Sequence, residues 1–385
     1  MSATHLFLWA EDSERELNLE LAQAFPGAQI EQTHSGLLQI TSEMALDSRL
    51  PCLVFSRQFL PFARTIHAES IRSWASDLTG VIIESLPDNQ PWVLHIEPHY
   101  SIRSIQRVGA RAWHSARKHS GKNVRFPLQD SQKHRTPEAG KHRCKLIRES
   151  IIEALKDKRR HLLRQLRGDS DPVLATNSLV QVLLTSPEAG FVSVAIAPLP
   201  WAQRHLLSRF PKGEVPVAVD KEAPSRAFAK LVEAELRMAR SINSGETCVD
   251  LGASPGSWSY VAARRGARVI AVDRAPLRED LLRNARINFV EGDAFRYSPP
   301  HKIDWLLCDV IAAPDRTADL LLHWLRKEWC KQFVVTIKLK EVPGADPLSL
   351  LKREMPALTQ EFFLTRLSAN KKEVCAFGCS RALDS

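Results

Sequence analysis

The stretch Thr247-Cys-Val-Asp-Leu-Gly-Ala-Ser-Pro-Gly-Ser-Trp-Ser-Tyr260 decides the fold of this chain. It reads as a short apolar strand that ends near an acidic residue, followed by a turn that contains Gly252 and Gly256. A helix is predicted from about Gly256 to Arg265. Open α/β sheets bind ligands at such turns, where a parallel strand ends, and glycine lets the backbone approach a ligand closely. The stretch therefore predicts an α/β fold with a binding site at this turn.

The ligand of the turn is not expected to be NAD, because the dinucleotide fingerprint needs three glycines in G-x-G-x-x-G. The pattern Asp-Leu-Gly-x-x-Pro-Gly-x-Trp instead resembles the first motif of S-adenosylmethionine (SAM)-dependent methyltransferases. Residues Arg268 to Asp273 read as the next strand, and an acid at its end can hydrogen-bond the hydroxyls of a ribose. The alternative, an ordinary strand–turn–helix without a ligand, does not explain why the turn and the acid agree in both type and spacing.

The composition indicates a globular protein with two or three domains. The chain has 385 residues, of which 44% are hydrophobic and 25% are charged. No apolar run approaches the length of a membrane span, and the start of the chain lacks the pattern of a signal peptide. Seven cysteines without a C-x-x-C pair suggest reduced thiols in the cytoplasm. Cys375 and Cys379 have no second pair of ligands, so no metal site is expected.

The positive charge is concentrated in one segment. The net charge is +9, but Arg103 to Arg167 holds 19 Lys or Arg against 5 Asp or Glu, a local +14, so the rest of the chain carries −5. Such an imbalance is typical of a nucleic-acid surface. The alternative is a pair of charge-rich helices that only face solvent.

The amino-terminal half is predicted to contain two small units. Residues 1–100 alternate strands and helices, which favours a ferredoxin-like α/β subdomain. Residues 101–200 contain a basic helix over Lys141 to Arg167, followed by a strand pair at 178–184 and 190–196. A basic helix backed by strands resembles an RNA-binding module of the THUMP type. Residues 201–222 are irregular and are expected to form a linker.

Residues 223–385 are predicted to form a Rossmann-like, doubly wound sheet, because strands alternate with helices along the whole segment. The helices are expected at 225–242, 315–331 and 347–358. After the central turn, the strands are expected at 268–273, 287–291, 303–308, 333–338, 362–367 and 374–379.

Four ionisable residues stand at informative places in this segment. Lys230 lies on the helix before the turn, whereas Asp309, Lys338 and Glu373 each lie at the end or the start of a predicted strand. The fold can bring such residues to one edge of the sheet. Each of them alone could be part of an ordinary surface ion pair, but together with the SAM-type turn they favour a catalytic cluster.

The order of these motifs resembles the FtsJ-like ribose 2′-O-methyltransferases, and within them the methyltransferase M family of large-subunit (23S) rRNA. The matching runs are Ser225-Arg-Ala-x-x-Lys-Leu-x-Glu233, the turn motif, Cys308-Asp309, Ile337-Lys338 and Lys372-Glu-Val374. The match is strong after Pro224 and weak before it. The resemblance implies a THUMP module before the methyltransferase domain, and a monomer that acts on a cytidine near the peptidyl-transferase centre. The partner would be 23S rRNA or a large-subunit assembly intermediate, with no membrane involved.

The resemblance also implies roles for particular residues. Lys230, Asp309, Lys338 and Glu373 correspond to the catalytic tetrad of the family, with Lys338 as the base. A lysine is a base only when neutral, so burial or Lys230 is expected to lower the pKa of Lys338. The implied SAM-binding residues are Ser225, Gly252, Ser254, Pro255, Gly256, Ser257, Asp273, Asp293 and Asp309. Ser257 replaces a glycine that is usual in the family, which places the geometry of the turn in question.

Other functions remain open. Amino-group methyltransferases carry Asp/Asn-Pro-Pro-Tyr/Phe where this chain has Cys308-Asp-Val-Ile311. Carbon-5 methyltransferases need a cysteine beside a proline, so Cys308 is interpreted as a core residue. The mRNA-cap methyltransferases share the four ionisable residues, but the basic segment favours rRNA. A non-catalytic RNA-binding or ribosome-assembly protein could also retain the fold and bind SAM, and only a loss of methyl transfer in Lys338→Ala would separate it from an enzyme.

Overall fold

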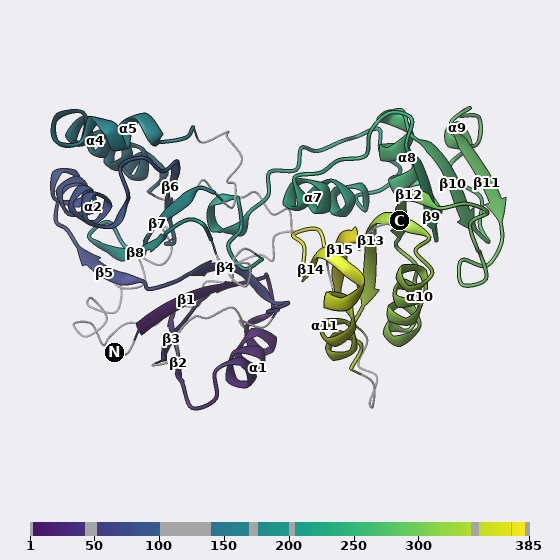
Figure 1. Ribbon diagram of the computed structural model, residues 1–385, viewed down its shortest axis with the longest axis horizontal. Helices are drawn as coiled ribbons and strands as arrows, with labels where there is room; N and C mark the ends of the chain where they lie inside the picture. The colour runs from purple at the N-terminus through teal and green to yellow at the C-terminus, as the bar shows by residue number, and fades with distance from the viewer. Residues whose placement is uncertain are drawn as a thin grey trace, which may run out of the picture.

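The computed structural model describes residues 3–42, 52–100, 140–168, 176–199, 205–339, 346–370 and 372–381. Figure 1 shows two halves side by side, with the amino-terminal half in purple to teal and the carboxyl-terminal half in green to yellow. The described strands of the first half form two four-stranded sheets, and those of the second half form one sheet of seven strands. The mixed α/β fold class predicted from the sequence is confirmed.

The first sheet has the strand order β2-β3-β1-β4, and every pair in it is antiparallel. Its elements are β1 (Ala3–Trp9), α1 (Glu14–Ala24), β2 (Gln29–His34), β3 (Leu37–Ser42) and β4 (Ser56–Leu60). The helix α1 packs Leu17 and Leu21 in the same core cluster as Phe7. The strand β2 was not predicted, because its sequence Gln-Ile-Glu-Gln-Thr-His is polar and lies at the exposed edge of the sheet.

The second sheet has the order β5-β8-β7-β6, in which only β6 and β7 are parallel. Its strands are β5 (Arg64–His67), β6 (Trp92–Pro98), β7 (Ser178–Leu184) and β8 (Ala189–Ala195), and α2 (Ile71–Ser85) and α4 (Lys141–Lys158) pack against its core. The sheet therefore combines strands from both sides of residue 100, so the boundary predicted there is not a boundary between sheets. Residues 101–139 of the predicted RNA-binding subdomain lie outside the described residues.

The basic helix predicted over Lys141 to Arg167 is divided in two. The helix α4 ends at Lys158, Arg159 has a non-helical φ of −152°, and α5 (Arg160–Gln165) follows. The second helix turns toward β6, where the indole Nε1 of Trp92 donates a hydrogen bond of 2.7 Å to the carbonyl of Leu162. Packing against this buried tryptophan therefore interrupts a pattern that looks like one helix in the sequence.

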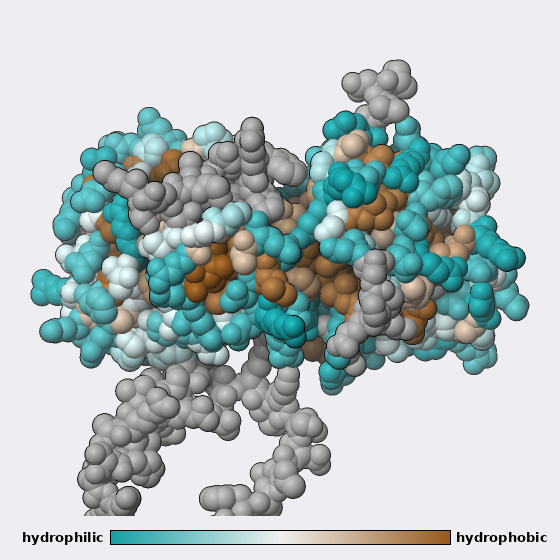
Figure 2. Space-filling view, turned by 90° about the horizontal axis from the view of Figure 1, so that it is seen from below, coloured by the Kyte–Doolittle hydropathy of each residue, from teal (hydrophilic) through white to brown (hydrophobic). Residues whose placement is uncertain are grey.

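Direct contacts join the two halves. The Glu20 carboxylate accepts hydrogen bonds from the backbone N–H groups of Val54 and Phe55, and it also pairs with Lys352 Nζ of the second half at 2.7 Å. Arg366 of the second half donates to Ser13 Oγ at 2.6 Å. Figure 2 shows hydrophobic residues gathered near the seam between the halves on the face seen from below. No described helix has the length and apolar character needed to cross a membrane.

The large sheet has the order β11-β10-β9-β12-β13-β15-β14, and only β15 runs opposite to the other strands. Its strands are β9 (Thr247–Leu251), β10 (Arg268–Asp273), β11 (Ile287–Glu291), β12 (Ile303–Cys308), β13 (Cys330–Lys338), β14 (Thr359–Thr365) and β15 (Glu373–Ser380). The helices are α7 (Phe228–Met238), α8 (Ser257–Arg264), α9 (Glu279–Leu282), α10 (Pro314–Arg326) and α11 (Pro347–Leu358).

Both faces of this sheet are covered by helices. Side chains that alternate along the strands pack either with α7 and α8 or with α10 and α11. Burial on both faces explains the nearly continuous apolar runs of the central strands. The helix α10 is shorter than predicted, because the chain already turns back into β13 at Cys330. The helix α7 ends at Met238, because Ala239 takes a left-handed conformation with φ of +53°.

Candidate active site

The turn after β9 needs glycine at two positions. Gly252 has a φ of +73°, and a Cβ added there would lie 2.6 Å from Val310 Cγ1 and 3.0 Å from the Val310 Cα. Gly256 precedes α8 and has a φ of +106°. The turn is closed by hydrogen bonds from Gly252 N to Val272 O at 2.9 Å and from Gly256 N to Ala253 O at 2.6 Å. The backbone of this turn therefore lies against the end of β12 without any side chain between them.

Two acids follow the neighbouring strands, as the sequence predicted. Asp273 ends β10, and its carboxylate accepts hydrogen bonds from Ser254 N at 3.0 Å and from Ala275 N at 2.9 Å. Asp293 follows β11 and accepts from Phe295 N at 2.9 Å, while Arg274 pairs with its other oxygen at 2.7 Å. The hydrogen bond from Phe295, together with Arg274, lowers the pKa of Asp293. Both carboxylates are therefore held in fixed orientations.

A cavity of about 380 Å³ lies between the turn and the ends of β10, β11 and β12. Five of the predicted cofactor residues line it: Gly252, Ser254, Asp273, Asp293 and Asp309. The other four, Ser225, Pro255, Gly256 and Ser257, do not. Pro255 O accepts a hydrogen bond from Arg278 N at 3.1 Å, and the hydroxyls of Ser225 and Ser257 lie 2.7 Å apart. These four residues shape the turn and its junction with α7.

The cavity fits a nucleoside-sized ligand. Its volume is within the range of small-molecule sites. Each oxygen of Asp273 uses one lone pair for a backbone N–H, so both oxygens retain a lone pair that can accept from hydroxyl groups. Phe295 adds an aromatic wall, with the guanidinium of Arg316 4.1 Å from its ring centre. The residues present are therefore suited to hold the adenosine part of SAM.

The four ionisable residues predicted as a tetrad come together beside this cavity. Lys230 Nζ lies 3.0 Å from Asp309 Oδ2 and 2.6 Å from Glu373 Oε1. Lys338 Nζ lies 2.9 Å from Asp309 Oδ1 and also pairs with Glu373 Oε2. Each carboxylate thus touches both lysines, in a closed cluster of two positive and two negative charges. All four side chains are largely buried, with exposed fractions between 8% and 18%.

The pKa of Lys338 differs from the expectation. Burial disfavours its charged form, but the attraction of Asp309 and the hydrogen bonds to Glu373 and Asp309 are stronger, so the pKa is raised. The expected lowering of this pKa is therefore wrong. The prediction weighed Lys230 but not the two carboxylates that lie between the lysines. Burial also opposes the charged form of Glu373, but hydrogen bonds from both lysines lower its pKa to about 2.

Sequence reasoning missed one polar residue of this site, Asn370. Asn370 donates from Nδ2 to Glu373 Oε1 at 3.1 Å, and only its closeness to Glu373 in the sequence could have indicated this. Asp250 on β9 is 1% exposed and accepts from Ser259 Oγ at 2.6 Å, and burial raises its pKa to about 7. Cys308 is fully buried, and burial raises the pKa of its thiol to about 12, which agrees with a core residue. No cluster of potential metal ligands occurs among the described residues.

The fold and this site together define a class of protein. A sheet of this strand order, with one reversed strand, a glycine turn after β9 and acids after β10 and β11, is the architecture of SAM-dependent methyltransferase domains. Residues 223–352 match the profile of the family described as FtsJ-like methyltransferase, so this segment is similar to that family. The resemblance inferred from the sequence is thereby confirmed.

Curated relatives carry one recurring name, Ribosomal RNA large subunit methyltransferase M. The protein of Alkalilimnicola ehrlichii is 38% identical over 136 residues, which cover 34% of this chain and 38% of that protein. The protein of Marinomonas sp. is 31% identical over 186 residues, which cover 47% of this chain and 51% of that protein. The chain thus spans about half the length of these relatives or less. A solved Plasmodium falciparum structure, titled a putative ribosomal RNA methyltransferase, reaches a TM-score of only 0.33 at 17% identity, covering 40% of this chain and 97% of that one.

Proposed function

We propose that this protein is a SAM-dependent 2′-O-ribose methyltransferase of large-subunit ribosomal RNA. One observation carries the proposal: Asp309 lines the cofactor cavity and also pairs with both lysines of the cluster. A single carboxylate thereby joins a nucleoside-sized site to a group of residues that can exchange protons. The names of the relatives support ribosomal RNA as the substrate.

The geometry supports a division of roles. SAM, when bound, supplies a methyl group on a positively charged sulfur. Asp273 and Asp293, which line the cavity, would hold its ribose and adenine, and Asp309, which accepts from Lys338 at 2.9 Å, would orient this lysine. The Lys338 side chain is the more exposed of the two lysines, at 18%, and its Nζ is the group that would take the proton of the ribose 2′-hydroxyl. The Lys230 side chain is only 8% exposed, and it would hold the two carboxylates in place by contacting both oxygens of Asp309 and Oε1 of Glu373.

The finer assignments belong to the same proposal. We infer a cytidine near the peptidyl-transferase centre of 23S rRNA as the target, in free rRNA or in an assembly intermediate, and a cytoplasmic monomer as the active form. The amino-terminal half would bind the RNA through the basic face of α4 and α5. Its division into a ferredoxin-like part and a THUMP part, with a linker at 201–222, is proposed on the same resemblance.

The test is a map of 2′-O-methylation in 23S rRNA from cells with and without the gene. We expect one methylated ribose to be lost without the gene, to return with the wild-type protein, and to stay absent with Lys338→Ala. Lys331→Ala is the matched control. Lys331 lies at the opposite end of the same strand, is 58% exposed and pairs with Asp304 at 2.8 Å, so this variant should restore the methylation.

Two outcomes would contradict the proposal in different ways. An unchanged rRNA map in cells without the gene would exclude rRNA as the substrate. Full methylation by Lys338→Ala would remove the catalytic role of Lys338. The non-catalytic alternative would be correct if two results were obtained together. The wild-type protein would methylate no ribose of the rRNA, and Lys338→Ala would still bind SAM and restore ribosome assembly.

A further inference from the structure

The loop that precedes β15, here residues 366–370, is held in place by the buried carboxylate of Glu233, which lies on helix α7. Glu233 lies on α7, one turn after Lys230 and therefore on the same side of the helix. It is 1% exposed, and its Oε2 accepts a hydrogen bond of 2.8 Å from the backbone N–H of Ser368. The Ser368 hydroxyl lies 3.4 Å from the other oxygen. One helix thus supplies both a lysine of the cluster and the anchor of the loop that leads to Glu373.

Asn370 fixes the same loop from within. It is 9% exposed, and its Oδ1 accepts from Leu367 N at 2.7 Å, which closes the loop on itself. Its Nδ2 donates to Glu373 Oε1 at 3.1 Å, the same oxygen that pairs with Lys230. The side chain of Asn370 therefore links the shape of the loop to the orientation of the Glu373 carboxylate.

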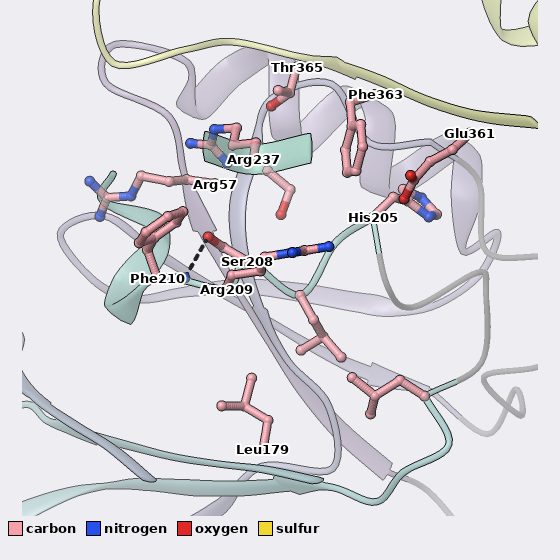
Figure 3. Close-up of a pocket in the computed structure, with 13 residues that line it drawn as sticks. Arg57, Leu179, His205, Ser208, Arg209, Phe210, Arg237, Glu361, Phe363 and Thr365 are labelled. Carbon is pink, nitrogen blue, oxygen red and sulfur yellow. Dashed lines mark hydrogen bonds between the residues drawn. The ribbon is translucent and has the colours of Figure 1, made fainter. Parts of the chain in front are cut away.

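The anchor extends to the junction between the halves. Arg237 pairs with Glu233 Oε1 through Nε at 3.0 Å and through Nη2 at 2.8 Å, and Nη2 also donates to the carbonyl of Gly213 at 3.1 Å. Figure 3 shows Arg237 in the pocket between the halves, where Arg57 comes from the first half and Phe363 from the second. Arg57 itself pairs with Glu214 at 3.2 Å, next to Gly213. A continuous set of contacts therefore runs from the junction through Glu233 to the catalytic loop.

The cluster needs such a support. Glu373 must present one oxygen to Lys230 and the other to Lys338, so even a small rotation of its carboxylate would lengthen one of the two contacts. We propose that Glu233 and Asn370 are positioning residues, which hold the loop before β15 so that Glu373 bridges both lysines. Neither residue touches the cofactor cavity, and both act only through Glu373. This inference rests on the proposed methyltransferase function.

Helix α7 also contains a second buried glutamate, Glu235, which serves as a matched control because its ion pair supports only the fold. Glu235 is also 1% exposed, also pairs with an arginine, Arg265, and also accepts a backbone N–H, from Ile242 at 2.9 Å. It differs in that its contacts do not reach the loop before β15. Glu233→Gln and Glu235→Gln therefore remove the same charge from two equally buried sites on one helix.

The experiment measures methyl transfer from SAM to 23S rRNA isolated from cells that lack the gene, with the full-length protein. We expect Glu233→Gln to lower kcat by about 10-fold or more, the scale on which small misplacements of catalytic groups act. The KM for RNA and the Kd for SAM should stay within about 2-fold of the wild type. Glu235→Gln should lower the melting temperature of the protein by about as much as Glu233→Gln does, but it should leave kcat unchanged. Equal effects of the two variants on kcat, or none, would overturn the proposal.

Asn370 supplies an independent test if Glu233→Gln does not fold. Asn370→Ala removes the donor to Glu373, so we expect kcat to fall while the Kd for SAM stays unchanged. Asn370→Asp keeps the acceptor for Leu367 N but places a second carboxylate beside Glu373, which favours the charged form of the lysines, so the rise of kcat with pH should move to higher pH. An unchanged kcat in Asn370→Ala together with an unshifted profile in Asn370→Asp would contradict the positioning role. If the wild type itself transfers no methyl group, the proposed function fails instead, which is a separate outcome.

Discussion

Asp309 contacts both the cofactor cavity and the two lysines of the charged cluster. It follows the last residue of β12, faces the cofactor cavity, and accepts hydrogen bonds from two lysines that come from α7 and β13. Its partner Glu373 completes the cluster from a strand that runs in the opposite direction. The cluster proposed as the reacting centre is thus assembled from four segments of the chain, and each contributes one charge.

The raised pKa of Lys338 predicts how kcat depends on pH. A lysine acts as a base only in its neutral form, and below its pKa this form increases tenfold for each unit of pH. Because the two carboxylates raise the pKa of Lys338, we expect kcat to rise with pH from about 7 to 9, without a plateau. Single-turnover methyl transfer across this range measures it. Lys338→Arg keeps the positive charge, but a guanidinium does not lose its proton in this pH range and cannot act as a base, so the variant should stay inactive at every pH. A plateau near neutral pH would show that the bound ligands lower this pKa.

At the level of single residues, the sequence indicates which ionisable groups matter but not their electrostatics. Asp309, Lys338 and Glu373 could be chosen because they stand at strand ends, and Lys230 because it precedes the turn on a helix and matches, with the other three, a known order of motifs. The sign of the shift in the Lys338 pKa depends on distances to both carboxylates, which no spacing in the sequence reveals. The same holds for Asn370, whose role depends on how the loop folds back onto Glu373.

At the level of elements, the turn after β9 depends on a close contact between two segments. Gly252 lies against the backbone of Val310, so Gly252→Ala adds a steric clash to the strain of a positive φ. We expect this variant to weaken SAM binding at least about 10-fold, since β9 and β12 must move apart at the cavity. Isothermal titration calorimetry with SAM measures it.

Gly245→Ala is the control for backbone strain alone. Gly245 also has a positive φ, of +86°, but a Cβ there would meet no atom within 4 Å. It should lower stability by about 1 kcal/mol, the usual cost of an alanine in this conformation, and leave SAM affinity unchanged. If both variants bound SAM equally well, the contact with Val310 would not be what shapes the cavity.

The elements that could be predicted are those with a strong apolar pattern. The strands β9, β10 and β12 were recognised with the bounds observed or nearly so, because burial on both faces leaves little polar sequence within them. The edge strand β11 was recognised as well, because it keeps an apolar core of sequence in Ile287, Phe289 and Val290. The strands β2 and β5 were missed, because both lie at sheet edges and consist mostly of polar residues. Helix ends were set by packing and by left-handed residues such as Ala239, which local propensity does not indicate.

At the level of the whole molecule, the described helices of the basic segment carry an excess of positive charge. Between residues 140 and 167 there are ten Lys or Arg and three Asp or Glu, a local charge of +7. Some of these cations already have acidic partners, such as Lys156 with Glu153 and Arg159 with Asp88. Arg160 and Arg164 lie exposed on α5. They are therefore good candidates for contacts with RNA phosphates.

Binding of RNA by the full-length protein should fall steeply with salt, because phosphate contacts release counterions. We expect the double variant Arg160→Ala, Arg164→Ala to reduce the slope of log K against log salt by about 1.5. Fluorescence anisotropy with a 23S rRNA fragment at several salt concentrations measures this slope. Arg283→Ala with Arg286→Ala removes the same charge from exposed positions next to β11 and should leave the slope unchanged. If the RNA affinity of the wild-type protein did not change with salt concentration, phosphate contacts would not explain its binding.

The pairing of β6 with β7 has a consequence for how this protein can change over evolutionary time. The two strands are neighbours, in register from Trp92–Ser178 to Pro98–Leu184, yet the whole chain between them, α4 and α5 included, is an excursion from one strand to the next. Because the two strands are parallel, the connection must cross from the end of β6 to the opposite end of the sheet, and α4 buries Ile147 and Ile151 in the core against these strands. The buried face of α4 is therefore constrained by the sheet, whereas its exposed basic face is free to change in sequence without altering the strand order.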